Sequence, residues 1–150
     1  MRHLQFIVTA LLLMLAVGCS EGPPVDPVAR ASDNEDVCEA VLRHQFADNA
    51  AWAGRQMQAY FILVNREEPT EDFLARFAGN SPPVRNGLDF TAGAGILFRV
   101  DQLEWSEDNS YVEVYGSYDA GPQSKAKCRY KATRQNGEWA VTTEQKELGR

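Results

Sequence analysis

The chain has 150 residues, of which 44% are hydrophobic and 24% are charged, and its formal net charge is -6. This profile is typical of one soluble globular domain and excludes a disordered chain or a protein with several membrane spans. The acidic balance also argues against nucleic acid as a partner, because affinity for phosphate backbones comes mainly from basic groups.

The first 18 residues have the organisation of an export signal. Met1-Arg2-His3 form a short basic start, and the stretch 4–17 is apolar except for Gln5 and Thr9. As a helix of ~1.5 Å rise per residue, this stretch would reach only about 21 Å, short of the ~30 Å hydrocarbon core. The sequence therefore predicts a cleaved signal peptide over 1–18 and no permanent membrane span.

The end of this stretch, Leu15-Ala16-Val17-Gly18-Cys19, resembles the lipobox of bacterial lipoproteins, with Ala16 at the place usually held by leucine. The resemblance implies that Cys19 becomes the acylated N-terminus of the mature chain, with membrane lipid as its partner. Two or more acyl chains give stable anchoring. Ser20 after the cysteine, in place of Asp, implies an outer-membrane location facing the periplasm in a Gram-negative source.

Residues 20–34 are rich in proline and poor in large apolar groups. This composition predicts a flexible, lipidated tether over 19–34, followed by one folded domain over 35–150.

Two further cysteines, Cys38 and Cys128, would lie in an oxidising compartment, where a structural disulfide between them is expected. Cys38 falls on the apolar stripe of a helix predicted to open with a capping box from Ser32 to Glu35. Cys128 falls on the inner face of the alternating segment 125–132. The alternative is a reactive or metal-binding thiol pair.

Zinc would need two more His or Cys ligands, and the mature chain offers only His44. The sequence therefore predicts no metal and no cofactor.

The middle of the chain predicts a strand and a short helix. The run 59–64 is apolar throughout and suits a strand buried on both faces, although a buried helix reaching back to Trp52 is the alternative. A helical turn should begin at Pro69-Thr70 and end at Gly79, with an apolar face made by Phe73, Leu74 and Phe77. An extended, stiff connection over 80–83 should follow, because each proline lacks a backbone donor.

The last third alternates as four strands over 96–105, 111–118, 125–133 and 139–143. The apolar phase changes near Asp101-Gln102, which predicts a bulge, and Asn136-Gly137 predicts a tight hairpin turn. The expected fold is α+β, with an N-terminal helix packed on a curved antiparallel sheet that ends in a four-strand meander. By analogy of pattern, this order of elements looks like the NTF2-like or cystatin-like folds.

Three segments of the mature domain also resemble a family of functionally uncharacterised bacterial secreted proteins. They are Phe73 to Gly79 with Pro82-Pro83-Val84, Gly95 to Val100, and Asn136 to Val141. The resemblance implies no activity and no catalytic residue.

Markers of catalysis are scarce. No Gly-x-Ser-x-Gly elbow, phosphate-binding glycine loop or His-Glu-x-x-His helix occurs in the sequence. Carboxylates cluster at Glu67, Glu68, Glu71 and Asp72, and could form an acid/base pair or a calcium site. Matching of the helix dipole is the simpler account of the last two.

One face of the strand 125–133 is basic, and the preceding strand adds tyrosines in the corresponding phase. Such a face could bind an anionic glycan, a lipid head group or an acidic protein. The alternative is a solvated sheet face whose charges discourage aggregation. The possible binding residues are Lys125, Lys127, Arg129, Lys131, Tyr111 and Tyr115.

Three classes of function stay open. The first is a noncatalytic envelope lipoprotein that binds a ligand or a partner of unknown specificity. The second is a small cavity enzyme of the NTF2-like kind that uses His44 with a carboxylate such as Asp48. The third is an envelope assembly factor or inhibitor that presents the stiff loop 80–84 to another protein. A closed cavity with two convergent ionisable groups would favour the enzyme.

Overall fold

The computed structural model describes residues 26–50, 58–122 and 124–149. Their order is one long helix, a strand, a short helix, a short strand with a 3₁₀ turn, and four long strands. The elements are α1 (Pro27–Asp48), β1 (Ala59–Val64), α3 (Glu71–Ala75), β2 (Val84–Asn86), η1 (Gly87–Asp89), β3 (Gly95–Trp105), β4 (Tyr111–Asp119), β5 (Lys125–Gln135) and β6 (Glu138–Leu148).

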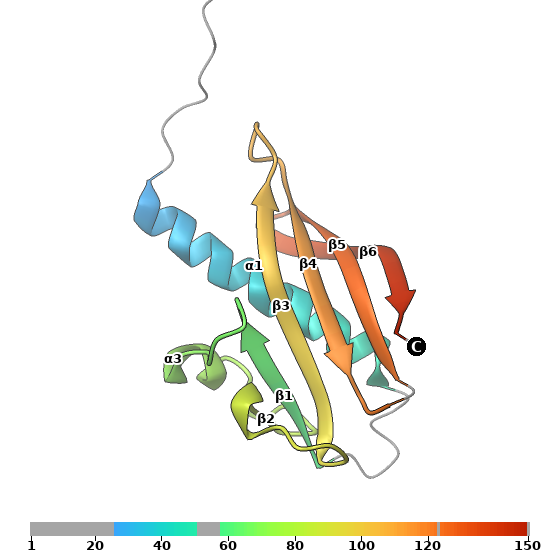
Figure 1. The fold of residues 1–150 in the computed structure, drawn as a ribbon. Helices are drawn as coiled ribbons and strands as arrows, with labels where there is room; N and C mark the ends of the chain where they lie inside the picture. The colour runs from blue at the N-terminus through green and yellow to red at the C-terminus, as the bar shows by residue number, and fades with distance from the viewer. Residues whose placement is uncertain (1–25, 51–57, 123, 150) are drawn as a thin grey trace, which may run out of the picture.

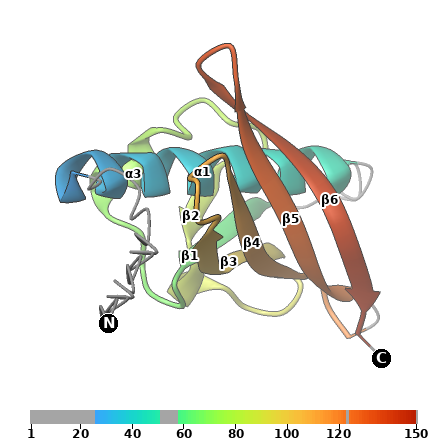
Figure 2. The same cartoon turned by 90° about the horizontal axis from the view of Figure 1, so that it is seen from above.

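The strands form one six-stranded sheet in the order β2-β1-β3-β4-β5-β6, and α1 lies across one of its faces (Figures 1 and 2). From β3 onward, each strand pairs antiparallel with the next one in the chain. β1 pairs in parallel with both β2 and β3. The fold is therefore α+β with a mixed, open sheet.

The expectation of a wholly antiparallel sheet is wrong at β1. The chain leaves β1, passes through α3, β2 and η1, and returns to the same end of the sheet before β3 begins. A parallel pair needs a crossover of about a dozen residues or more, and this connection is long enough to provide one.

Helix α1 begins earlier than the sequence predicted. The side chain of Asp26 accepts a hydrogen bond from the Val28 amide at 2.9 Å, and Pro27 occupies the first helical turn. Asp is a favoured N-cap, and proline suits the first helical position because its missing N–H would have no helical partner there. The expected capping box at Ser32 to Glu35 lies inside the helix, so residues 27–34 belong to α1.

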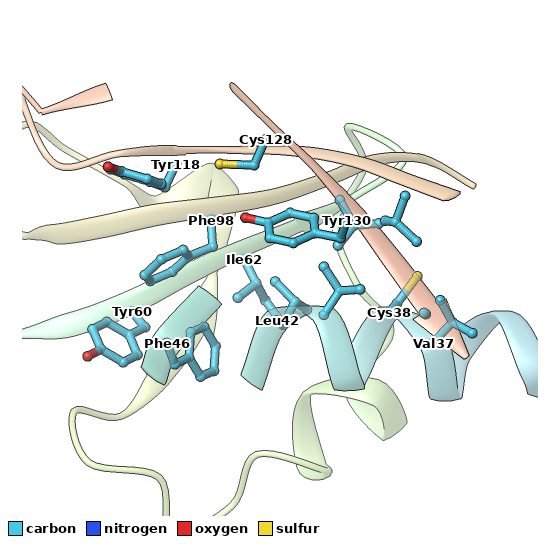
Figure 3. Packing of buried hydrophobic residues seen from close by; sticks show 14 of the residues in the cluster. Val37, Cys38, Leu42, Phe46, Tyr60, Ile62, Phe98, Tyr118, Cys128 and Tyr130 are labelled. Atoms are coloured by element: carbon cyan, nitrogen blue, oxygen red, sulfur yellow. The ribbon is translucent and has the colours of Figure 1, made fainter. Parts of the chain in front are cut away.

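The predicted apolar stripe of α1 is confirmed, and it packs on the inner face of the sheet (Figure 3). The aromatic rings of Phe46, Tyr60 and Phe98 meet there with centroid separations of 4.8 to 5.2 Å. Phe73 and Phe77 from the α3 region close the same core, as predicted. Buried residues on the helix are Val37, Cys38, Val41, Leu42, Gln45, Phe46 and Asn49.

β1 is buried on both faces, as predicted for its continuous apolar run. Tyr60 and Ile62 point into the main core. Phe61 and Leu63 belong to a second apolar cluster on the other face of the sheet, together with Leu97. The segment 87–94 supplies partly buried cover to that cluster through Phe90 and Ala94.

The two predicted irregularities in the long strands are present. The register of β3 with β4 shifts between Val100 and Gln102, which is the expected bulge. Asn136 and Gly137 both have positive φ, 52° and 89°, which suits the tight turn between β5 and β6. No helix within residues 26–50, 58–122 and 124–149 combines the length and apolar character needed to cross a membrane.

Candidate functional site

The outer face of the sheet, opposite α1, carries the predicted basic residues. Burial alternates along β5, so that Ala126, Cys128 and Tyr130 are buried and the intervening residues face outward. β4 alternates in the same phase. The structure therefore places the predicted residues on one face, in the phase that the sequence indicated: Lys125, Lys127, Arg129, Lys131, Tyr111 and Tyr115.

Cross-strand neighbours neutralise part of this face. On the β4 side, Lys125 forms an ion pair with Asp119 at 2.8 Å, and Lys131 lies opposite Glu113. On the β6 side, Lys127 lies opposite Glu147. The basic row is thus interleaved with carboxylates, which sequence reading of a single strand could not show.

The tyrosines are engaged within the face. The Lys131 ammonium lies 4.2 Å from the centroid of the Tyr111 ring, a cation–π arrangement. The hydroxyl of Tyr115 donates to Glu113 at 3.3 Å. Burial, with the charges of Glu104 and Glu113, raises the pKa of Tyr115, so its hydroxyl stays protonated at neutral pH.

A hollow of about 520 Å³ lies where β4 turns into β5, and its lining includes Arg99, Lys125, Lys127, Asp119 and Glu147. Three cations therefore stand against two carboxylates. Burial acts to raise the pKa of Asp119, but hydrogen bonds from Lys125 and the Gly121 amide, with nearby positive charge, lower it overall. Asp119 is accordingly ionised at neutral pH.

Arg99 also lies on this face, although it was not among the residues predicted from the sequence. Its position between the buried residues Phe98 and Val100 already indicated an outward side chain. The order of the strands, which the sequence did not reveal, brings β3 beside β4, where Arg99 lies opposite Ser117. We call Arg99, Lys125, Lys127, Asp119 and Glu147 the outer-face hollow from here on.

The predicted disulfide is not formed. Cys38 and Cys128 are both buried and both free. They belong to the same core, but they lie apart, as the view of Figure 3 shows. Cys128 lies near Asp48, the last residue of α1, because the charge of the Asp48 carboxylate acts on the Cys128 thiol. Cys38 lies ten residues earlier, which is about 15 Å along the helix axis.

Sequence periodicity gave the correct face for each cysteine but not the position along α1. Cys38, at the middle of α1, lines a groove with Val64, Phe73 and Leu103, whereas Cys128 lies near the C-terminal end of the helix. A disulfide requires Cα atoms within about 7 Å. Two residues that both point into one core can still lie too far apart for a bond.

We expect both thiols to resist alkylation in the native protein at pH 8. Burial, with a contribution from Glu35, raises the pKa of Cys38 to about 12, so only about one molecule in 10,000 carries the thiolate. Burial also raises the pKa of Cys128. Peptide mapping after alkylation without reductant should show both residues unmodified in the native state and modified after unfolding. Recovery of a linked Cys38–Cys128 peptide would contradict this expectation.

His44 and Asp48 lie close together on α1, and Thr143 of β6 joins them. The enzyme hypothesis required both to face a cavity, and the hollow that His44 lines does not include Asp48. His44 Nε2 lies 2.9 Å from the Thr143 hydroxyl and 3.6 Å from the Asp48 carboxylate. Both partners therefore approach the same ring nitrogen. In a catalytic relay, the carboxylate holds the opposite nitrogen while the reacting hydroxyl faces the first. The geometry is that of a surface hydrogen-bond cluster joining α1 to β6.

The four carboxylates beside Pro69 lie in two separate places in the structure. Glu67 and Glu68 line a groove of about 490 Å³ at the end of β1, and Glu68 accepts a hydrogen bond from Asn86. Glu71 and Asp72 stand in the first turn of α3, after the Thr70 cap. Among the described residues, no three His, Cys, Asp or Glu side chains are grouped to hold a metal ion.

The stiff loop before β2 is held at both ends. The side-chain amide of Asn80 donates to the Pro82 carbonyl at 2.7 Å, and the Tyr60 amide donates to the Pro83 carbonyl at 2.9 Å. Ser81 and Pro83 are exposed. The loop is therefore ordered and accessible, as the hypothesis of an assembly factor or inhibitor requires.

The signal peptide over 1–18 and the lipidation site Cys19 lie outside the described residues. Comparison with known proteins adds no identity, because no family model, no curated protein and no solved structure matches this chain.

Proposed function

We propose that this protein is an exported lipoprotein of the cell envelope, anchored through acylated Cys19, whose α+β domain binds an anionic ligand or partner without catalysis. The outer-face hollow is the observation that carries the binding role. Its three basic side chains exceed its two carboxylates by one positive charge, although the net charge of the whole chain is -6. The lipobox resemblance at Leu15 to Cys19 supports the anchor and, with Ser20, an outer-membrane location facing the periplasm.

The chemistry of the hollow favours an anion that can make several contacts. Arg99 offers a planar set of donors suited to carboxylate or phosphate, and Lys125 and Lys127 offer point charges. Ser117, in the same lining, adds a hydroxyl. An anionic glycan, a lipid head group and an acidic surface of an envelope protein all meet these requirements.

We also propose that the domain is of the NTF2-like or cystatin-like kind, with the four strands from β3 to β6 as its meander. The long helix across one face of the sheet and the bulge in β3 support this assignment (Figure 2). The role as a binding domain does not depend on it.

The anchor predicts a defined N-terminal peptide. Mass spectrometry of the protein isolated from membranes should recover a peptide that begins at acylated Cys19. A Cys19→Ala variant should stay unprocessed, because the acylated residue would be missing. Recovery of an unmodified Cys19, or of a mature chain that begins elsewhere, would contradict the proposed anchor.

If the basic outer face of the sheet binds an anion, reversing the charges on that face should impair function. Complementation by a Lys127→Glu, Arg129→Glu double variant should be reduced at least tenfold relative to the native chain. This difference should narrow at high ionic strength, because salt screens both the native attraction and the repulsion introduced by the variant. The measurement is growth or envelope integrity of a strain that lacks the native gene.

Two controls make this test specific. Arg85→Glu with Lys146→Glu introduces the same change in net charge, with Arg85 on β2 and Lys146 paired in register with Cys128, and should complement normally. His44→Ala should also complement. If His44→Ala folds but loses function while the charge-reversal variant stays active, the binding role would be contradicted and an enzymatic role favoured.

A further inference from the structure

A second hollow, of about 140 Å³, lies between the first turns of α1 and the ends of three strands. Its walls are two tryptophans and two arginines. The rings of Trp105 and Trp139 meet edge to face at 5.7 Å. The guanidinium of Arg30 lies 3.8 Å from the Trp105 ring centroid, and that of Arg134 lies 4.9 Å from the Trp139 centroid. We call Arg30, Trp105, Arg134 and Trp139 the tryptophan–arginine site.

Neighbouring side-chain oxygens hold several of the donors in place. Trp105 Nε1 donates to Asn34 at 2.9 Å, and Arg134 pairs with Asp33 at 2.6 Å. One nitrogen of the Arg30 guanidinium donates to Asn109 at 2.5 Å. These contacts join α1, the β3–β4 turn and the β5–β6 hairpin around one small space.

Two donors in this group have no partner. Arg30 Nη1 and Trp139 Nε1 are buried atoms without a hydrogen bond among the described residues. A buried donor left unpaired is destabilising, and native proteins rarely leave such groups unsatisfied. Two of them beside one hollow therefore point to a missing acceptor.

The kind of acceptor follows from the chemistry of the two groups. Indole and guanidinium groups only donate, so the missing group must supply lone pairs. Asp33 balances the charge of Arg134, whereas Arg30 has no carboxylate within ion-pair distance among the described residues. The site therefore retains positive charge, which favours an anion over a neutral acceptor.

The size of the hollow limits the ligand. At about 140 Å³ and only partly enclosed, the hollow suits the small end group of a ligand. A carboxylate with its first carbons has this size. Its flat shape also fits beside indole rings, and its two oxygens can accept from Arg30 and Trp139 together.

From these observations we propose that the tryptophan–arginine site binds the carboxylate of a small organic acid or of a peptide C-terminus. Both orphaned nitrogens are buried, so neighbouring side chains must shift for a carboxylate to reach them. This site is separate from the outer-face hollow, because it lies at the start of α1 and shares no residue with it.

Tryptophan indole resonances provide a direct test. The full-length, ¹⁵N-labelled chain in neutral detergent would be titrated with sodium acetate, and separately with sodium chloride at equal ionic strength. The chain has three tryptophans, and single Trp→Phe variants assign their indole signals. We expect the Trp139 signal to move saturably with acetate, in the millimolar range expected for so small a ligand. The Trp105 signal should move less, because its N–H is already bonded to Asn34.

Matched variants then separate specific binding from general charge effects. Arg30→Gln should weaken acetate binding at least tenfold, whereas Arg85→Gln removes the same charge from β2 and should leave it unchanged. A linear response equal to that of chloride, or an unchanged titration in a folded Arg30→Gln variant, would overturn the proposal. Saturation by inorganic phosphate but not by acetate would also overturn it, in favour of a tetrahedral anion.

Discussion

Replacing Phe98 with alanine is expected to lower the free energy of unfolding by about 4 kcal/mol, near the upper end for large-to-small core changes. Phe98 is fully buried, and its ring contacts Phe46, Tyr60 and Tyr118 with centroid separations from 5.0 to 6.4 Å. Removal of the ring takes away packing with α1, β1 and β4 together, so the neighbours cannot collapse easily into the space. Urea denaturation followed by circular dichroism measures the loss.

The matched control is Phe90→Ala. Phe90 is only partly buried and packs against Phe61 in the smaller cluster, with centroids 5.5 Å apart. We expect a cost of about 1 kcal/mol there, because less apolar surface returns to water. Equal losses for the two variants would show that the core is not organised around Phe98.

The second large effect is expected at Gly95, where β3 begins beside β1. A Cβ on Gly95 would collide with the carbonyl group of Ala59, whose carbon would lie only 2.9 Å away. Backbone of the paired strand cannot rotate aside as a side chain can, so β1 and β3 would have to separate locally. We expect Gly95→Ala to cost about 3 kcal/mol, at the upper end for overpacking.

Thermal and urea unfolding of Gly95→Ala test this expectation. Gly149→Ala is the control, because the nearest atom to its added methyl group would be Lys125 Cβ at 3.1 Å, at the exposed end of the chain. Its effect should stay within about 0.5 kcal/mol. A Gly95→Ala variant as stable as the native protein would show that the parallel pairing of β1 with β3 is looser than the structure has it.

Most of the secondary structure could be predicted from local periodicity in the sequence. The stripe of α1, the doubly buried run of β1 and the alternation of β4 and β5 all arise from residues within one element, where side-chain direction depends on spacing alone. The bulge in β3 and the turn at Asn136-Gly137 have equally local causes. These features could therefore be predicted without knowledge of the fold.

Features that depend on how elements are placed relative to one another could not be predicted in this way. The parallel pairing of β1, the position of Cys38 far from Cys128, and the arrival of Arg99 beside Lys125 all depend on strand order and on distance along α1. The tryptophan–arginine site is the clearest case. Its residues are separated by up to 109 positions in the chain, from 30 to 139, and no local pattern relates them.

The early start of α1 also sets how far the domain can travel from a membrane. If Cys19 is acylated as we propose, only eight positions separate it from Pro27, where the helix begins. A fully extended chain of that length spans at most about 28 Å, about half the reach of a sixteen-residue tether ending at 34. The domain would then work close to the lipid surface, so a partner must lie in the same membrane or approach within that short radius.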